Sequence, residues 1–547
     1  MRCPPGMGIL VFLLLACLHP GQPVRGEETG WRLERVARGG DFHGLQGLAF
    51  DAGDNLHAGS FAGPTILRVN VRNGRTSQVA GIQHAMAGGI AFGPDGAMYW
   101  TSPLLGSIRA FRPGEPVRVV AEGLPGVKAI GFDRRGRLYA SQIHLADTLL
   151  EIDPAGRQPP RKVVEGLGGL NGFAFAPDGK LVGALWSKGQ VVEIDPDSAH
   201  LQVLTDGLRV PSAVAFDGDG ALFVADGGTG QIVRVERPGG GKSLLARMAA
   251  GIDALAIDSR NQLFAANPVD NAIHRIDRLS GRSTRVLHGR LGLPGGLSIA
   301  DAGEEQMLYV ADLFALRAIT LRTGSPADIA RAPADPLRFP TNVNVSSAGT
   351  RYAYLSSWYS GTVQRIDRRS GRAPVLYEGF NAPMHAIDLP GNAMLVAEYG
   401  EGRLVKVLGR DGAERQLLAE GLGGPVALAR IGWEAVYVSE ELTGTISRVS
   451  LETGERRIVA RDLSQPEGIA LLPSGRLVVA EVGRQRLIEI DPADGRIDVI
   501  LGNLPIGLVA PASLPASFVL TGVAVSKEGD VYFSSDVENA IYRVSRR

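Results

Sequence analysis

Short runs of alternating apolar and polar residues follow one another along almost the whole chain, separated by turns rich in glycine and aspartate. In one typical stretch the runs are "AVAFD", "ALFVAD", "QIVRVER" and "SLLARM", and the separators are "GDG", "GGTG" and "RPGGG". Alternation with β-branched residues predicts strands, and the Gly/Asp pairs predict tight hairpins. The pattern therefore predicts groups of four short antiparallel strands.

This group of four strands recurs with a period of roughly 42 residues. The apolar end of its first strand falls at Phe50, Phe92, Phe132, Phe175, Phe216, Ile257, Ile299, Val345, Leu389, Arg430, Leu471 and Val525. Four antiparallel strands in a unit of about 40–50 residues are typical of a propeller blade. The sequence predicts an all-β fold of twelve four-stranded blades.

We expect the twelve blades to form a tandem pair of six-bladed β-propellers, residues 31–289 and 290–547, rather than one twelve-bladed ring. The irregular unit that opens with "GRLGLPGG" marks the boundary. The chain ends on a third strand, "AIYRVSRR", and begins with an unpaired strand, "WRLERVAR". In a tandem pair we expect the N-terminal strand to close blade 6 while "STRVLHG" crosses over to blade 12; in a single ring it would close blade 12 directly.

The N-terminus predicts export. Arg2 precedes the apolar run "GILVFLLLA", which is too short to span a bilayer. Either a signal peptide of residues 1–26 is removed, or "LLAC" acts as a lipobox and Cys17 carries a lipid anchor. We therefore expect a periplasmic or secreted protein. The only cysteines, Cys3 and Cys17, lie in this leader, which excludes disulfides and thiol chemistry in the folded part.

The formal net charge of zero argues against a nucleic-acid partner or an acidic membrane surface. No later segment is long and apolar enough to form a transmembrane segment. The chain has no P-loop, no G-x-S-x-G elbow, no H-E-x-x-H motif and no dinucleotide fingerprint.

The stretches "LFVADGGTGQIVRVE" and "RLVVAEVGRQRLIEID" resemble the repeats of NHL-repeat propellers and of gluconolactonase (senescence-marker)-like and streptogramin-lyase-like propellers. The resemblance covers residues 31–547 and implies the propeller architecture. Its relatives include hydrolases, lyases and binding scaffolds, so it does not imply one activity. Glu467, in "QPEGIAL", resembles the metal-binding glutamate of gluconolactonase-like enzymes, and Asn171 matches an asparagine position of the same pattern in the other half.

Two positions of each blade meet at the mouth of a propeller channel: the start of the first strand and the end of the second. In the first half these positions are polar and mixed, among them Gln46, Lys128, Asn171, Ser212 and Asp253. We expect this propeller to be a scaffold or accessory binding module. His43, His84 and His144 have no ligand spacing, and we expect them to lie outside any site.

In the second half the same positions bring a histidine and several carboxylates to one arc. His385 and Glu440 are the candidate catalytic residues, and Glu398, Glu467 and Glu481 are the candidate metal ligands. Carboxylates at close quarters need a cation or shifted pKa values. Oxygen ligands favour Ca²⁺, Mg²⁺ or Mn²⁺, and the histidine adds Zn²⁺. In the alternative interpretation, each strand-end acid accepts hydrogen bonds from nearby turns.

The last unit contains an insertion from Ile506 to Leu520 that is apolar and proline-containing, and we expect it to form a lid or pocket wall. The remaining candidate substrate-binding residues are Asp312, Thr341, Trp358, Thr521 and Asp536.

Two functions follow. The first is a metal-assisted hydrolase or lyase, lactonase-like, acting on a small oxygen-rich molecule at the second propeller. The alternative is a non-catalytic cell-envelope protein that binds a protein or glycan ligand.

Overall fold

The computed structural model describes residues 30–237, 239–302, 305–322, 324–333, 344–346, 351–372, 375–409 and 412–547. The leader with Cys17, and Thr341, lie outside these residues. Regular structure in the described ranges is β-strand apart from two single-turn 3-10 helices, η1 (Pro390–Asn392) and η2 (Val482–Arg484). None of the described helices could cross a membrane.

The strands form twelve antiparallel sheets of four, as the repeat predicts. Sheets one to three contain β2 (Leu45–Phe50), β3 (Leu56–Ser60), β4 (Leu67–Val69), β5 (Thr76–Gln78); β6 (Ile90–Phe92), β7 (Met98–Ser102), β8 (Ser107–Phe111), β9 (Arg118–Ala121); and β10 (Val127–Phe132), β11 (Leu138–Gln142), β12 (Thr148–Ile152), β13 (Arg161–Glu165). Sheets four to six contain β14 (Leu170–Phe175), β15 (Leu181–Leu185), β16 (Gln190–Ile194), β17 (Leu201–Thr205); β18 (Pro211–Phe216), β19 (Leu222–Asp226), β20 (Gln231–Val235), β21 (Lys242–Arg247); and β22 (Ala254–Ile257), β23 (Leu263–Asn267), β24 (Ala272–Ile276), β25 (Ser283–Leu287).

The other six sheets follow in chain order. Sheets seven to nine contain β26 (Pro294–Ala302), β27 (Glu305–Asp312), β28 (Ala315–Thr320), β29 (Pro326–Arg331); β30 (Asn344–Ser346), β31 (Tyr352–Ser357), β32 (Thr362–Asp367), β33 (Val375–Tyr377); and β34 (Pro383–Leu389), β35 (Ala393–Glu398), β36 (Arg403–Leu408), β37 (Glu414–Ala419). Sheets ten to twelve contain β38 (Pro425–Ile431), β39 (Ala435–Glu440), β40 (Thr445–Ser450), β41 (Arg456–Ala460); β42 (Pro466–Leu471), β43 (Leu477–Glu481), β44 (Arg486–Ile490), β45 (Ile497–Leu501); and β46 (Val523–Val525), β47 (Val531–Ser535), β48 (Ala540–Arg546) with β1 (Trp31–Arg38).

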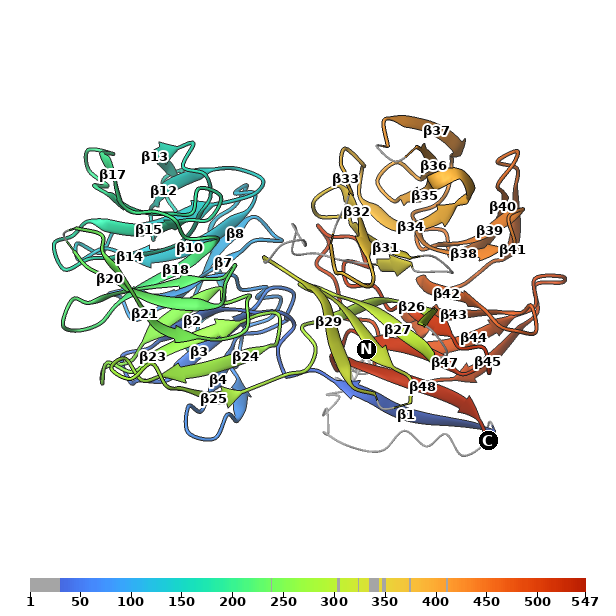
Figure 1. The fold of residues 1–547 in the computed structure, drawn as a ribbon, viewed down its shortest axis with the longest axis horizontal. Coiled ribbons are helices and arrows are strands. Elements are labelled where there is room, and N and C mark those ends of the chain that lie inside the picture. Colours follow the sequence, from blue (N-terminus) through green and yellow to red (C-terminus); the bar gives the residue numbers. More distant parts are fainter. Residues whose placement is uncertain are drawn as a thin grey trace, which may run out of the picture.

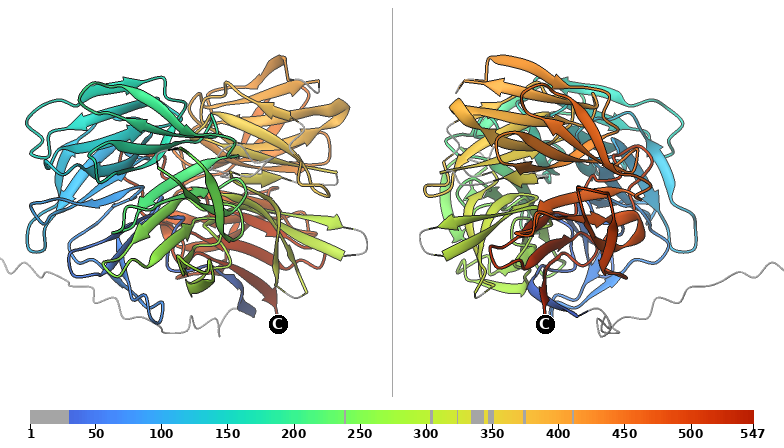
Figure 2. Two further views of the ribbon diagram at one scale, coloured as in Figure 1. Left: turned by 60° about the vertical axis from the view of Figure 1, so that its left-hand side comes forward. Right: turned by 90° about the vertical axis from the view of Figure 1, so that its right-hand side faces the viewer.

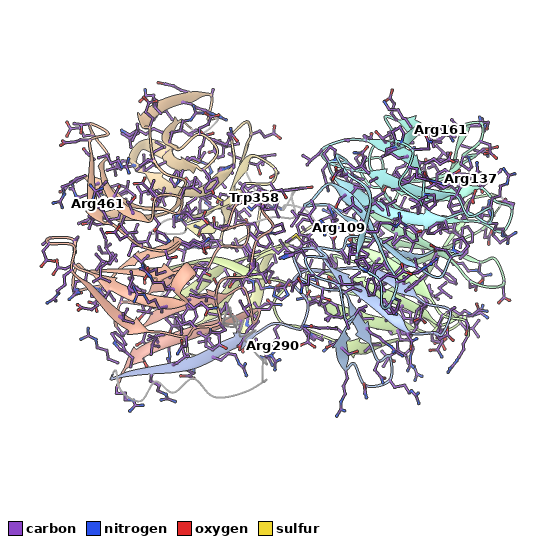
Figure 3. All side chains as sticks on the ribbon, turned by 180° about the vertical axis from the view of Figure 1, so that it is seen from behind. Arg109, Arg137, Arg161, Arg290, Trp358 and Arg461 are labelled. Atoms are coloured by element: carbon purple, nitrogen blue, oxygen red, sulfur yellow. The ribbon has the colours of Figure 1, made fainter. Side chains whose placement is uncertain are left out.

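The sheets close into two separate rings. Strand β2 of the first sheet packs against β22 and β23 of the sixth, and β26 of the seventh packs against β46 and β47 of the twelfth. Figure 1 shows the two rings side by side, Figure 2 shows them from two further sides, and Arg290, in the segment between β25 and β26, lies between them in Figure 3. The tandem six-bladed architecture is confirmed, and the expected boundary at residue 289 falls between β25 and β26.

The N-terminal strand closes a different blade from the one expected for a tandem pair. Strand β1 pairs with β48, with Trp31 opposite Arg546 and Arg38 opposite Ala540, and β25 remains in the sixth sheet. The crossover prediction was therefore wrong. Pairing with β1 protects the edge of the C-terminal strand, while the sixth sheet already has its own fourth strand.

Glycine is required where the second and third strands of a blade turn. Gly230 has a φ of +70°, and a Cβ there would lie 2.2 Å from the carbonyl oxygen of Met248. Gly444, at the same place in another blade, has a φ of +62° and would place a Cβ 2.1 Å from the carbonyl oxygen of Leu463. Only glycine combines this left-handed conformation with such a close approach, which explains why the glycines recur with the period.

The two rings are joined by a mixed apolar and charged contact. Phe61 of the first ring and Phe314 of the second meet edge to face at 5.9 Å, within a buried cluster drawn from both rings. Beside them the Arg331 guanidinium donates to Asp270 at 2.7 and 2.9 Å. The mouth of the first ring therefore lies against residues of the second.

Candidate functional site

A cavity of about 90 Å³ lies at the mouth of the first propeller. Five of the predicted rim residues line it together, namely Gln46, Lys128, Asn171, Ser212 and Asp253. They come from five different blades, because each stands at or next to the start of a first strand. The second propeller contributes Phe314, Pro333 and Tyr359 to the wall. Residues of both rings therefore form the wall of the cavity.

A charged pair crosses this mouth. Lys128 Nζ, on β10, donates to Asp253 Oδ2 at 2.5 Å, and Asp253 immediately precedes β22. Asn171 Nδ2 donates to Asp253 Oδ1 at 3.1 Å and to the carbonyl oxygen of Ser212 at 2.8 Å. Both charged side chains are mostly buried, with 10% and 19% exposure. The pair neutralises itself and leaves the cavity without net charge.

Aromatic rings form the sides of the cavity. His144 meets Trp186 edge to face at 5.0 Å, and Phe61 meets Tyr359 edge to face at 6.2 Å. Loss of hydration, together with the Lys128 ammonium, lowers the pKa of His144 to about 4, although the Asp253 carboxylate opposes the shift. The expectation that His144 lies outside any site was wrong, because the residue lines this cavity and remains accessible at its rim. Burial raises the pKa of Tyr359 to about 12, so both rings are neutral at pH 7.

One buried acceptor in this wall has no protein donor. Gln46 is 6% exposed, and its Oε1 has no hydrogen-bond partner among the described residues. A buried polar atom without a partner costs free energy, on the order of 1–3 kcal/mol. Because Gln46 lines the cavity, a ligand that donates an N–H or O–H there would remove this cost.

The strand-end acids of the second propeller form hydrogen bonds and ion pairs with residues of their own blades. Backbone N–H groups of the loop before the first strand donate to these carboxylates, as Gly292 and Leu293 do to Asp312 at 2.9 and 2.6 Å. The matching contacts are Asn381 N to Glu398 at 2.7 Å, Gly423 N to Glu440 at 2.7 Å and Ser464 N to Glu481 at 2.9 Å.

Each of these four acids also has an arginine partner. The pairs are Asp312 with Arg317, Glu398 with Arg403, Glu440 with Arg456, and Glu481 with Arg484 and Arg486. Their carboxylate oxygens fix a loop and balance a guanidinium. This arrangement matches the alternative interpretation of strand-end acids as acceptors for nearby turns.

His385 points into the channel of the second propeller. Its Nδ1 accepts from the backbone N–H of Leu428 in the neighbouring blade at 2.9 Å. Burial lowers its pKa to about 4, and its buried Nε2 has no hydrogen-bond partner among the described residues. In the described residues no hydrogen bond or ion pair joins His385 to Glu398. The neutral imidazole, held by one backbone N–H, forms part of the wall of this channel. The channel has a volume of about 290 Å³.

Glu467, Thr521 and Asp536 lie together beneath the insertion. Thr521 N donates to Glu467 Oε2 at 2.5 Å, and Gly507 N and Leu508 N donate to Asp536 at 3.0 and 2.6 Å. The insertion has neither helix nor strand. It is anchored on its other side by Trp358 Nε1, which donates to the carbonyl oxygen of Phe518 at 3.1 Å. Figure 3 labels Trp358 on the side of the second ring that faces the first.

The expected metal ligands do not fit a divalent ion in this arrangement. Glu398 and Glu481 face arginines, which repel a cation. Glu467, the third expected ligand, has no arginine partner and accepts from Thr521 N. Within the described ranges, no three His, Cys, Asp or Glu side chains are grouped so that they could hold a metal ion. No step of a reaction is therefore assigned to a metal.

The sequence correctly placed the polar residues of the first mouth, and it predicted that this propeller is a scaffold or accessory binding module. Lys128 is the cation among its opening positions and Asp253 the acid. Opposite charges at opening positions three blades apart could have indicated a pair across the channel. Glu441 was missed altogether; its Oε2 accepts from Ser517 Oγ of the insertion at 2.9 Å.

No protein-family model matches the chain, and no curated protein matches it in sequence. Two solved structures of the extracellular domain of BT4673 from B. thetaiotaomicron are similar, one described as a one-component system and one as a hybrid two-component system. Each is 11% identical, and the match covers 94% of this chain and 82% of that chain, with TM-scores of 0.33 and 0.32. Likeness at this level carries no functional argument.

Proposed function

We propose that this protein is an exported, non-catalytic binding propeller whose ligand is a small, uncharged, oxygen-rich molecule such as a glycan unit. The ligand occupies the cavity at the mouth of the first propeller. The observation that carries this proposal is the combination, in one cavity, of aromatic walls and the unpartnered acceptor Gln46 Oε1.

The chemistry of the cavity favours a neutral ligand. Lys128 and Asp253 balance each other, so a charged ligand would leave one charge uncompensated, which is costly in a partly buried site. A sugar hydroxyl can donate to Gln46 Oε1, and Lys128 has N–H groups beyond the one it gives to Asp253. Trp186 and Tyr359 offer apolar surface for the C–H faces of a sugar ring.

The binding function is favoured over the metal-assisted hydrolase because of the second propeller. A hydrolytic metal site there requires free carboxylates near His385. Glu398, Glu440 and Glu481 are instead paired with arginines and backbone N–H groups. Glu467 has no arginine partner, but it accepts from Thr521 N, and the described residues place no two further ligands with it that could hold a metal ion. The resemblance to NHL-type propellers supports a binding scaffold as readily as an enzyme, and the apolar leader supports an exported location.

Thermal shift assays of the mature protein test this function, with neutral mono- and disaccharides beside glucosamine and glucuronate as charged analogues. A bound ligand at a hundred times its Kd stabilises the folded state by about 2.7 kcal/mol. We expect neutral saccharides to raise Tm and charged analogues not to. Trp186→Ala and Gln46→Leu should weaken binding by at least about tenfold.

Trp433→Ala is the matched control, because Trp433 is 55% exposed on the second propeller and should leave binding unchanged. If no neutral saccharide raises Tm, or if Trp186→Ala binds as the wild type does, the proposed function is wrong.

A further inference from the structure

Three carboxylates hold the segment that covers the mouth of the second propeller, which we call the plug (residues 506–521). Asp536 accepts from the backbone N–H groups of Gly507 and Leu508. Glu441 accepts from Ser517 Oγ at 2.9 Å. At the C-terminal end, Glu467 accepts from the backbone N–H of residue 521 at 2.5 Å. Acidic side chains therefore accept hydrogen bonds from the plug near both of its ends and at one position between them.

These three acids differ from the other buried acids of the same rim. Asp312, Glu398, Glu440 and Glu481 each have an arginine partner. Within the described residues, no lysine or arginine forms an ion pair with Glu441, Glu467 or Asp536, which are 4%, 2% and 2% exposed. The acids that hold the plug are the ones that lack a compensating cation.

The groups facing this cluster add no positive charge. Glu467 feels the charges of Glu441 and Asp536, and Tyr399 lies against Glu441. From the first propeller, His43 Nε2 contacts the carbonyl oxygen of Asp536 at 2.8 Å. Burial lowers the pKa of His43, although its backbone hydrogen bonds to Asp536 and Val537 and the nearby Asp41 oppose this, so its imidazole is neutral at pH 7.

Burial without a cation shifts the acids toward their protonated forms. Loss of hydration raises the pKa of Asp536 to about 6, even though four backbone hydrogen bonds oppose the shift. The same cause raises the pKa of Glu441, and it raises that of Glu467 well above its ordinary value, helped by repulsion from the other two acids.

The plug closes one end of the second channel. Leu520 is fully buried with Met384 and Val426, and Trp358 and Tyr399 pack against this group. Leu520 also lines the channel that contains His385. Phe518 and Val519 of the plug also belong to the buried cluster between the two rings. Displacement of the plug would therefore open the channel toward the contact with the first ring.

We propose that the plug is a proton-dependent gate of the second propeller, closed while Glu441, Glu467 and Asp536 are protonated and released when they ionise. This goes beyond the proposed function, because it concerns the other propeller and needs no ligand. The open state exposes the carboxylates to water and returns them to ordinary pKa values. The closed state therefore binds more protons, and rising pH favours opening.

The size of the effect follows from Asp536. Its shift from 3.8 to about 6 makes closing roughly sixtyfold less favourable at pH 8 than at pH 4, since one pKa unit corresponds to a factor of ten and the open-state carboxylate is partly protonated at pH 4. Glu467 adds to this, because its pKa is raised in the same direction.

Hydrogen exchange of the plug amides from pH 5 to pH 8 tests the gate, with rates corrected for chemical exchange and referred to β43. In the full mature chain we expect exchange of residues 506–521 to speed up by about 10- to 100-fold over this range. The double variant Glu441→Gln/Glu467→Gln keeps the hydrogen-bond acceptors but cannot ionise there. Because Asp536 can still ionise, the double variant should lose the share of the pH dependence that comes from Glu441 and Glu467 and keep the share that comes from Asp536.

Glu398→Gln is the matched control, since Glu398 has an arginine partner and does not touch the plug; it should retain the wild-type pH dependence. Wild-type plug amides that exchange at the same corrected rate at pH 5 and pH 8 would overturn the proposal. So would a double variant with the wild-type profile. If the double variant lacks the β-sheet circular dichroism of the folded chain, Glu467→Gln alone replaces it, and the wild-type measurement still decides.

Discussion

Replacing Glu481 with glutamine distinguishes a structural acid from a reactive one. Its carboxylate is fully buried and accepts from Ser464 N as well as from Arg484 and Arg486. A glutamine preserves the side-chain volume and one acceptor. It removes the charge and turns an NH₂ group toward the guanidinium groups.

The expected loss of stability is about 2–3 kcal/mol. A hydrogen bond to a charged group contributes roughly 1.5–3 kcal/mol. The two arginines are 47% and 26% exposed, so water screens their ion pairs and each adds no more than about 1 kcal/mol. For a propeller of this size, 1 kcal/mol changes Tm by about 2–4 °C. Glu481→Gln should therefore lower Tm of the second propeller by roughly 5–10 °C.

Differential scanning calorimetry at pH 7, with and without EDTA, measures this effect. Glu452→Gln is the control, because Glu452 is exposed on a turn of the same propeller, and it should leave Tm within about 1 °C. EDTA should change neither protein. A wild-type Tm that falls on chelation, while that of Glu481→Gln does not, would show that Glu481 holds a metal and would refute the structural assignment.

Three further outcomes follow from particular contacts. The pKa of His385 is lowered to about 4, so its contribution to stability is present above its ordinary pKa of 6.5 and is lost as the pH falls to about 4. Between these two pH values the Tm of the wild type should drop more steeply than the Tm of His385→Gln. Parallel curves would contradict the assignment of His385 as a buried neutral imidazole. Lys128→Met should destabilise the first propeller by about 2–4 kcal/mol because it leaves Asp253 unpaired, and adding Asp253→Asn should recover more than about 1 kcal/mol in urea unfolding; strict additivity would exclude a coupled pair. Deleting residues 31–38 exposes the edge of β48 and should lower Tm of the second propeller and promote aggregation, measured by light scattering; an effect confined to the first propeller would contradict the pairing with β48.

The fold could be predicted from sequence because each blade repeats the same local information. Strand alternation, hairpin glycines such as Gly230 and the period all agree, so errors in one unit are corrected by the others. The sheet with which β1 pairs could not be predicted in the same way. An unpaired edge strand fits the sixth or the twelfth blade equally well by pattern, and the choice depends on the packing of complete rings.

The site was predictable only in part, for a related reason. Hairpin geometry correctly brings Gln46, Lys128 and Asp253 to one mouth, but the cavity also needs Tyr359 from the other propeller. Residue type alone suggested that the acids of the second mouth were reactive. The sequence also contained a pattern that indicates a structural role for these acids, because an arginine stands five residues after Glu398 and five residues after Glu481. Such a spacing places the guanidinium across the hairpin from the acid.

The most direct test of the central claim is a crystal structure of the mature protein soaked with the neutral saccharide that gives the largest thermal shift. The account predicts saccharide density at the mouth of the first propeller, between Trp186 and Tyr359, with a hydroxyl group within hydrogen-bonding distance of Gln46 Oε1. Density on the second propeller beside His385, with this mouth unchanged, would contradict it.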